Sequence, residues 1–189
     1  MRENALELHG VCKKYSGFAL RNVGFTLPRG TVMGLIGENG AGKTTLMKVL
    51  FGLETPQTGK VYMDGKEVKI LNTLDAIEKG IGMVHQHFML IPSLTVAENV
   101  VRGVEPMKNG LFDFKKAVEM TEEVAKKYNF NIDPMARVSD LSVGQMQKIE
   151  IMKVLIKGAK IIIMDEPTAV LTPQETEELF EQLLLLKES

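Results

Sequence analysis

The sequence LSVGQMQKIEIMKVLIKGAKIIIMDE, from Leu141 to Glu166, predicts a capped helix, then a buried strand with two carboxylates at its end. Ser142 and Gln145 have the S-x-x-Q spacing of a capping box, so we expect a helix to begin here. Gly158 is placed to end that helix. The apolar residues that share one face of it are Met146, Ile149, Met152 and Ile156. The run Lys160–Met164 is too apolar for a half-exposed strand and favours a central parallel strand covered on both faces.

A second motif lies upstream, where GENGAGKT fits the phosphate-binding pattern G-x-x-x-x-G-K-[ST]. It follows the apolar run at residues 31–36, which predicts a buried strand, and we expect a helix to begin at Lys43. Glycines let the loop curl so that several N–H groups point inward at a positive helix N-terminus. Lys43 adds a charge for the outer phosphates, and Thr44 offers a hydroxyl to Mg²⁺. The alternative is a Gly-rich turn without a ligand. The predicted nucleotide-binding residues of the loop are Gly37, Asn39, Gly40, Ala41, Gly42, Lys43, Thr44 and Thr45.

Two adjacent carboxylates, Asp165 and Glu166, follow the second apolar strand. Open α/β sheets place their ligands at the carboxyl ends of their strands. We therefore assign Asp165 to Mg²⁺, directly or through water, and Glu166 to polarising the attacking water. The alternative is an acidic pair that only marks the surface end of the strand.

The order of these motifs resembles that of ABC ATPases over the whole chain. The resemblance is carried by GENGAGKTT, Gln86, LSVGQ and IIIMDEP. It implies an α/β fold: a P-loop NTPase (RecA-like) core with an antiparallel β flank and an inserted helical subdomain. ATP and Mg²⁺ are the cofactors that the resemblance implies, with Lys43, Gln86 and Glu166 as the catalytic residues.

The same resemblance assigns roles to further positions. Ser142, Gly144 and Gln145 match the signature sequence that contacts the γ-phosphate of a nucleotide held by a second nucleotide-binding domain, which makes each site composite. A well-capped core helix without catalytic duty is the alternative. Tyr15 matches the aromatic that stacks on adenine, although ordinary packing also explains a tyrosine after a strand. Gln86 matches the glutamine that senses Mg²⁺ and water.

The chain departs from the usual ABC pattern in three ways. Val143 replaces the first glycine of LSGGQ and adds a β-branched side chain near the expected phosphate. Thr172 stands in place of an aspartate, and Thr172-Pro-Gln-Glu175 is itself a good helix start. The sequence given reaches Ser189 before the family's strand and switch histidine. We therefore expect a truncated fragment that binds nucleotide with little or no turnover.

Two histidines flank Gln86 with H-x-H spacing, namely His85 and His87. A metal site of this kind is disfavoured because no third ligand cluster lies nearby in the sequence.

The coarse pattern predicts three regions. Residues 1–87 form the ATP-binding core with its antiparallel flank, in which Asp64-Gly65 predicts a two-residue hairpin. Residues 88–157 form a helical subdomain with a capping box at Thr95–Glu98 and a loose stretch at 103–110. Residues 158–189 continue the core. We also expect a short helix at 72–79 and a strand at IGMV.

Composition excludes several classes of protein. A chain of 189 residues buries roughly 70% of its unfolded surface, so it needs no disulfide or metal staple. The single cysteine, Cys12, argues against an oxidising compartment. No signal peptide and no membrane-spanning apolar run is visible. A net charge of −1 with interspersed signs weakens any nucleic-acid interpretation.

The sequence thus predicts the ATP-hydrolysing subunit of an ABC importer for a small polar solute, a sugar or a nucleoside. The implied partners are a second nucleotide-binding domain, fused or homodimeric, membrane permease subunits and, indirectly, an extracytoplasmic solute-binding protein. Its place would be the cytoplasmic face of the cell membrane. Two alternatives are a soluble ABC-type ATPase acting on ribosomes or DNA, which the absence of sustained heptads between Gln86 and Leu141 disfavours, and a nucleotide-binding regulator without hydrolysis.

Overall fold

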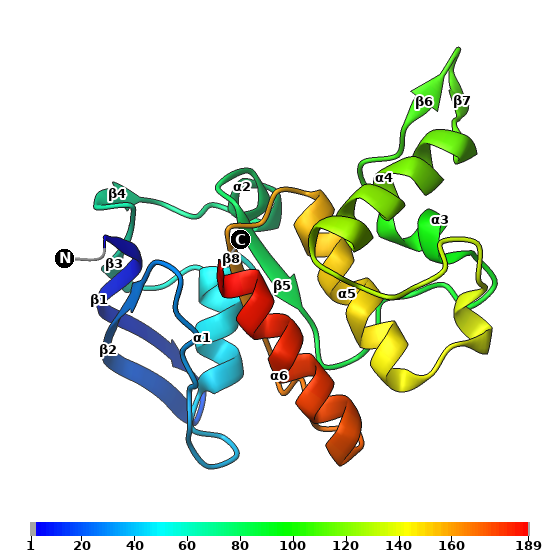
Figure 1. The fold of residues 1–189 in the computed structure, drawn as a ribbon. Coiled ribbons are helices and arrows are strands. Elements are labelled where there is room, and N and C mark those ends of the chain that lie inside the picture. Colours follow the sequence, from blue (N-terminus) through cyan, green and yellow to red (C-terminus); the bar gives the residue numbers. More distant parts are fainter. Residues whose placement is uncertain (1–2, 189) are drawn as a thin grey trace. The chain divides into compact units, whose positions relative to one another are not determined.

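The computed structural model describes residues 3–188 and divides into two compact units between Ile81 and Gly82. Each unit is described by itself below (Figure 1). The division into residues 1–87, 88–157 and 158–189 expected from the sequence stays a prediction.

The first unit is built on an antiparallel sheet with the strand order β2-β1-β3-β4. Its long hairpin pairs Leu8 of β1 with Phe25 of β2, and β3 lies on the other edge of β1, where Leu8 faces Val61. The strands are β1 (Asn4–Tyr15), β2 (Phe18–Pro28), β3 (Thr58–Met63) and β4 (Lys66–Val68). Leu6 and Leu8 of β1 are buried, as alternation along a one-sided sheet requires. Val11 is also buried, because the register of β1 against β2 shifts between Leu8 and Val11. The predicted antiparallel flank is confirmed.

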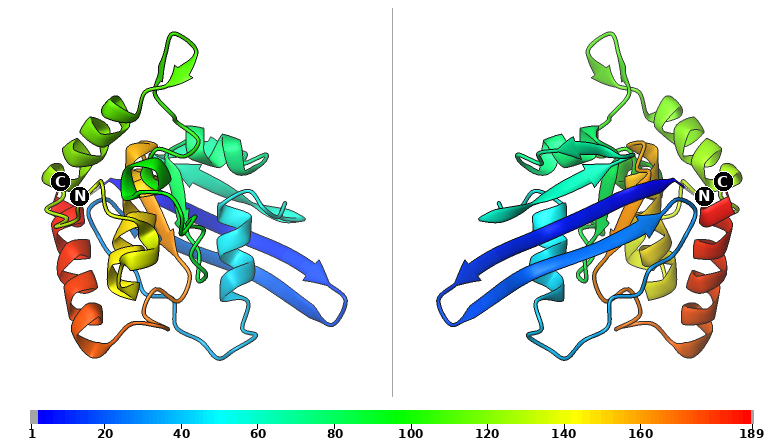
Figure 2. Two further views of the ribbon diagram at one scale, coloured as in Figure 1. Left: turned by 90° about the vertical axis from the view of Figure 1, so that its right-hand side faces the viewer. Right: turned by 90° about the vertical axis from the view of Figure 1, so that its left-hand side faces the viewer.

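Local turn signals in this unit are also confirmed. Asp64 and Gly65 connect β3 to β4 with φ angles of 51° and 73°, which is the left-handed pair that a tight hairpin turn needs. Helix α1 (Lys43–Leu50) begins where the P-loop predicts, and α2 (Thr73–Glu78) begins after Asn72, whose side chain accepts from the N–H of Asp75 at 2.9 Å. The views in Figure 2 place α1 beside the sheet.

The expected strand at residues 31–36 is wrong. These residues form an extended segment without a strand assignment, and Ile36 is 99% exposed. Thr31 opens the segment by donating its hydroxyl to the carbonyl of Pro28 at 2.6 Å. Apolar composition gives a segment the propensity for a strand, but a strand forms only where a neighbour supplies ladder hydrogen bonds. Within residues 3–188 no strand pairs with this segment.

The second unit combines a two-stranded sheet, order β5-β8, with a group of helices. The strands expected at IGMV and near Lys160–Met164 are present as β5 (Ile81–Val84) and β8 (Ile161–Met164). The helices are α3 (Val96–Val100), α4 (Phe114–Lys127), a 3-10 turn at Val138–Asp140, α5 (Val143–Ile156) and α6 (Pro173–Glu188). No helix in the described part of the chain is both long enough and apolar enough to span a membrane.

Apolar side chains from α3, α4, α5 and α6 pack into one core in this unit. In α5, Ile149 and Met152 are buried as predicted, and Met146 and Ile156 pack against the core from its edge. The buried face of α5 is wider than the single row of apolar residues that was predicted, because Gln147 and Glu150 are buried too. The core is made of Val84, Val96, Val100, Ala125, Phe130, Val138, Ile149, Ile151, Met152 and Leu179.

The stretch expected to be loose contains a small hairpin. Strands β6 (Met107–Lys108) and β7 (Leu111–Phe112) pair through a turn at Asn109 and Gly110, whose φ angles are 52° and 80°. An Asn-Gly pair is the usual signal for such a turn. The prediction missed it because the flanking strands are too short to show alternation.

A buried asparagine anchors the segment between β5 and α3. Asn99 is fully buried and accepts from the N–H of Ile91 at 2.8 Å. Its amide donates to the carbonyls of Ile91 at 3.1 Å and Thr95 at 3.0 Å. One side chain therefore satisfies backbone groups that would otherwise lie unpaired in the interior.

We expect Asn99→Ala to lower the free energy of unfolding by about 2–3 kcal/mol, because it leaves buried backbone groups of the Ile91 segment without partners. Chemical denaturation monitored by circular dichroism measures the change. Asn131→Ala is the matched control, since Asn131 is exposed and its loss should cost less than about 0.5 kcal/mol. Equal effects of the two substitutions would contradict the anchoring role.

Candidate functional site

The P-loop depends on a glycine at the start of α1. Gly42 is the N-cap of α1 with φ 94° and ψ 10°, a left-handed conformation that glycine adopts without strain. A Cβ at this position would lie 2.5 Å from Leu20 Cδ2 and 2.6 Å from Phe18 Cζ. No side chain caps α1, whereas Thr95 and Ser142 cap α3 and α5. The dipole and the N–H groups at the start of a helix such as α1 are suited to an anion.

Lys43 is held over the same loop. Its Nζ donates to the carbonyls of Gly37 at 2.5 Å and Glu38 at 3.1 Å, and the N–H of Ala41 donates to the carbonyl of Glu38 at 3.1 Å. The loop therefore turns around the ammonium group and presents it beside the start of α1. Asn39, Gly40, Thr44 and Thr45 belong to the same loop and first turn. Glycine backbone, ammonium group and helix N-terminus together fit a polyphosphate.

Tyr15 lies at the end of β1 in the same unit as the P-loop. Its ring stacks on that of Phe18, with centroids 6.5 Å apart and planes at 29°. Phe18 in turn packs against Gly42. Burial, followed by the nearby Glu54 carboxylate, raises the pKa of the Tyr15 hydroxyl. The Tyr15 ring thus contacts Phe18, and Phe18 lies beside Gly42, the N-cap of α1.

The second unit brings Gln86 and Glu166 together. Gln86 follows β5, Glu166 follows β8, and Gln86 Nε2 donates to Glu166 Oε2 at 3.1 Å. Asp165 directly follows β8, and its N–H donates to the carbonyl of Val84 at 3.2 Å. Glu166 has φ 49°, a left-handed conformation that costs a non-glycine residue about 1–2 kcal/mol. Such a cost at the end of a strand is typical of a functional position.

The signature sequence forms the start of α5 as predicted. The Ser142 side chain accepts from the N–H of Gln145 at 3.2 Å, and Gln145 Oε1 accepts from the N–H of Ser142 at 2.9 Å. This reciprocal pair confirms the capping box. Val143, in the place of the usual glycine, is the first residue of the helix.

One hydrogen bond at the start of α5 was not predicted. The N–H of Gly144 donates to Glu175 Oε1 at 2.9 Å, across 31 residues of sequence. The other oxygen of Glu175 accepts from the N–H and the hydroxyl of Thr172, each at 3.0 Å. The Thr172 cap of α6 is thus confirmed, and its partner carboxylate also serves the N-terminus of α5. The Thr172 and Gly144 N–H groups hold the pKa of Glu175 below its ordinary value.

A buried carboxylate links α5 to the segment that carries Gln86. Glu150, whose side chain is 5% exposed, accepts from the N–H of Met89 at 2.6 Å and from Lys153 Nζ at 2.9 Å. Lys153 Nζ also donates to the carbonyl of Met89 at 3.2 Å. The sequence signal was available, since Glu150 lies at a helical position between buried residues, but the sequence analysis gave it no role. This pair fixes the backbone three residues after Gln86.

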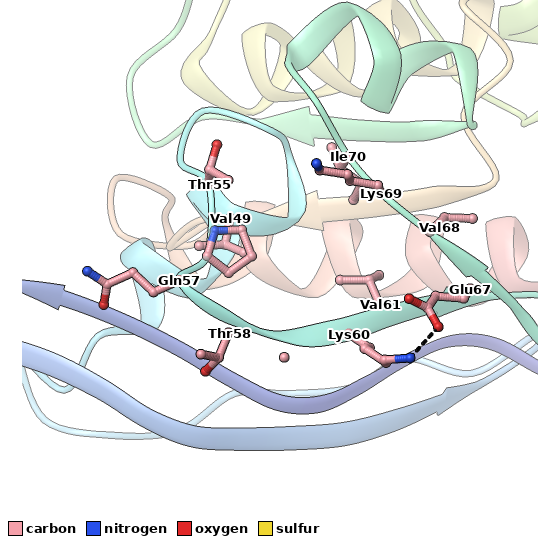
Figure 3. Close-up of a pocket in the computed structure, with 12 residues that line it drawn as sticks. Val49, Thr55, Gln57, Thr58, Lys60, Val61, Glu67, Val68, Lys69 and Ile70 are labelled. Carbon is pink, nitrogen blue, oxygen red and sulfur yellow. Dashed lines mark hydrogen bonds and ion pairs between the residues drawn. The ribbon is translucent and has the colours of Figure 1, made fainter.

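The metal site considered for His85 and His87 would need a third ligand among the described residues. Within residues 3–188, no three His, Cys, Asp or Glu side chains cluster as a metal site would require. A pocket of about 210 Å³ is lined by residues of α1, β3 and β4 and of the adjoining loops. Figure 3 shows the ion pair between two of these residues, Lys60 and Glu67, whose charged atoms lie 2.7 Å apart. None of the predicted site residues lines the pocket.

Comparison with known sequences identifies the family. The sequence profile of the family described as ABC transporter matches residues 20–169. The chain therefore belongs to the ABC transporter family.

Its relatives include import proteins. The guanosine import ATP-binding protein NupO of Bacillus subtilis is 45% identical over 180 residues, covering 95% of this chain and 35% of the relative. The nucleoside import ATP-binding protein NupA of Lactococcus lactis is 44% identical over 180 residues, covering 95% and 36%. The ribose import ATP-binding protein RbsA 2 of Streptomyces coelicolor is 42% identical over 187 residues, covering 98% and 36%. The chain thus spans about a third of the length of these curated relatives.

Solved structures agree on the fold. The ADP conformation of MJ1267, an ATP-binding cassette of an ABC transporter, has a TM-score of 0.85 and 26% identity, covering 98% of this chain and 77% of that one. A nucleotide-free ATP-binding cassette gives a TM-score of 0.83 at 25% identity, covering 98% and 78%. These likenesses confirm the predicted α/β fold class of P-loop NTPase with antiparallel and helical additions.

The lowered pKa of Glu175 predicts a pH-dependent contribution to stability. Because the folded-state pKa lies below the unfolded value, the ionised carboxylate stabilises the fold above the unfolded pKa. That stability is lost as pH falls through the folded pKa. We expect Glu175→Gln to unfold at a lower temperature than the wild type at pH 7, with the difference shrinking below about pH 4.

Thermal unfolding at a series of pH values tests this expectation. Glu177→Gln is the control, because Glu177 is an exposed residue of the same helix. A difference for Glu175→Gln that stays constant across the pH range would rule out the ionised carboxylate as its source.

Proposed function

We propose that the chain is the ATP-binding and ATP-hydrolysing domain of an ABC importer. The observation that carries the hydrolytic part is the hydrogen bond between Gln86 and Glu166 at the ends of β5 and β8. A carboxylate held by an amide after a strand can accept hydrogen bonds from a water molecule and orient it. The import part is supported by relatives whose names are those of import ATP-binding proteins.

The P-loop would bind the triphosphate of ATP. Lys43 supplies a positive charge at the loop, and Gly42 leaves the N-terminus of α1 open to phosphate oxygens. Gly37, Gly40 and Ala41 would contribute backbone N–H groups, with Asn39 and Thr45 as flanking contacts. Tyr15 would stack on the adenine, since it lies in the same unit and reaches the P-loop through Phe18.

We propose Mg²⁺ as the second cofactor. Thr44, Gln86 and Asp165 would supply a hydroxyl, an amide and a carboxylate, which carry hard oxygen ligands of the kind Mg²⁺ takes. Mg²⁺ would neutralise phosphate charge. Glu166 would hold the attacking water and take its proton, and Gln86 would keep the Glu166 carboxylate oriented.

The signature helix would serve the nucleotide of a second nucleotide-binding domain. Ser142 and Gln145 shape the N-terminus of α5, and the Gly144 N–H points to an anion, here the carboxylate of Glu175. A γ-phosphate would need the same donors. We propose that the second domain is either fused to this one or a second copy, and the greater length of the relatives supports fusion.

The transported solute would be a nucleoside or a sugar. Support comes from the names of the relatives and from the His-Gln-His-Phe run around Gln86, which resembles the nucleoside branch. Permease subunits would then hold the protein at the cytoplasmic face of the membrane, with a solute-binding protein as an indirect partner. Co-purification with a membrane permease tests this assignment, and recovery with ribosomes or DNA would favour the soluble alternative.

We expect Lys43→Ala to lower ATP affinity at least about a hundredfold, because it removes the ammonium group that the P-loop would offer to the phosphates. Isothermal titration calorimetry measures affinity, and circular dichroism should report an unchanged fold. Lys66→Ala is the matched control, since Lys66 is an exposed residue of β4. Wild-type affinity in Lys43→Ala would refute the P-loop assignment.

We expect Glu166→Gln, made in the importer protein that carries this chain, to keep ATP bound and to slow hydrolysis at least about a hundredfold. Glutamine preserves the shape of the side chain but cannot take a proton. Phosphate release measures turnover and filter binding measures retention. Turnover at the wild-type rate would assign the orientation of water to another group.

A further inference from the structure

Two charged residues of α5 hold both backbone polar groups of Met89, in the segment between β5 and α3. Glu150 Oε1 accepts from the N–H of Met89 at 2.6 Å, and Lys153 Nζ donates to the Met89 carbonyl at 3.2 Å. The two side chains also pair with each other at 2.9 Å, and they are only 5% and 13% exposed. Burying two charges costs free energy, which the pair recovers only where further hydrogen bonds satisfy its remaining atoms. The backbone of Met89 supplies those bonds.

Hydrogen bonds, more than packing of its own side chain, hold Met89 in place. The residue is 58% exposed, so its side chain gains little from the core. Two residues before Gln86, the carbonyl of Val84 accepts from the N–H of Asp165 at 3.2 Å. Gln86 therefore lies between two anchored residues, Val84 and Met89. Three residues of extended chain span at most about 11 Å, so the place of Met89 limits where the backbone of Gln86 can lie.

We propose that Glu150 and Lys153 are positioning residues for ATP hydrolysis. By fixing Met89, they keep the Gln86 amide where it donates to Glu166 Oε2 at 3.1 Å. This inference rests on the proposed function, because it takes Glu166 as the residue that orients the attacking water. Among the described residues, the side chains of Glu150 and Lys153 hydrogen-bond only to Met89 and to each other. Their effect therefore falls on turnover, because the proposed phosphate contacts come from the P-loop.

Replacing both charged residues removes the anchor without leaving one buried charge unpaired, which would destabilise the fold strongly. The paired variant carries Glu150→Leu and Lys153→Met in the importer protein that contains this chain. We expect its kcat for ATP hydrolysis to fall about tenfold, because Gln86 loses its fixed place, while ATP affinity stays within about twofold of the wild type. Phosphate release measures kcat, calorimetry measures affinity, and circular dichroism checks the fold.

Ile151→Val is the matched control for a general loss of stability. Ile151 lies in the buried core of the same helix, and its side chain has no polar group for the backbone of Met89. Shortening it lowers stability and should leave kcat unchanged. Glu150→Gln tests the hydrogen bond itself, also where the paired variant does not fold, because it keeps the side-chain shape and an oxygen for the Met89 N–H. We expect Glu150→Gln to retain at least about a third of the wild-type kcat.

A double-mutant cycle with Gln86→Ala separates positioning from a general effect on the protein. We expect Gln86→Ala to slow hydrolysis, and the paired substitutions to cause no further loss in the Gln86→Ala protein, because they act through Gln86. Losses that multiply, an equal loss in Ile151→Val, a loss of about tenfold in Glu150→Gln, or a folded paired variant with the wild-type kcat would overturn the inference. An importer protein that hydrolysed no ATP before any substitution would instead overturn the proposed function itself.

Discussion

The structure depends on how the unpaired N–H groups at the starts of its helices are satisfied. The first turn of every helix leaves donors without an internal partner. In α3, α5 and α6 a side chain three residues away supplies the acceptor, through Thr95, Ser142 and Thr172. In α1 the N-cap is Gly42, which has no side chain to offer. Helix α1, whose start carries the P-loop lysine, therefore has no side-chain cap from its N-cap residue.

The same constraint explains the arrangement at α5. Its capping box satisfies the N–H groups of Ser142 and Gln145, and Gly144 is left with a donor that Glu175 accepts. A carboxylate of the chain itself thus accepts from the N–H group that we propose as a phosphate contact. The two helix starts differ in this respect, because the N-cap residue of α1 offers no side-chain acceptor, whereas the start of α5 holds a carboxylate of the chain itself.

Buried polar groups hold the loops that connect these helices to the strands. Asn99 satisfies the backbone around Ile91, and Glu150 with Lys153 satisfies both polar groups of Met89. These side chains leave the segment after Gln86 with defined partners on α3 and α5. The segment therefore has a fixed path into the helical group, and Gln86 and Glu166 meet at the ends of their strands.

Features that involve residues three or four apart were determined by the sequence alone. The capping boxes, the Asp64-Gly65 turn and the start of α1 were predicted because each depends on local stereochemistry and short-range hydrogen bonds. The tertiary structure alone decided the fate of residues 31–36, because a strand needs a partner that composition cannot supply. It also decided the partners of Glu175 and Glu150. The sequence does not distinguish one carboxylate on a helix from another, because the N–H or ammonium group that binds it comes close only when the chain folds.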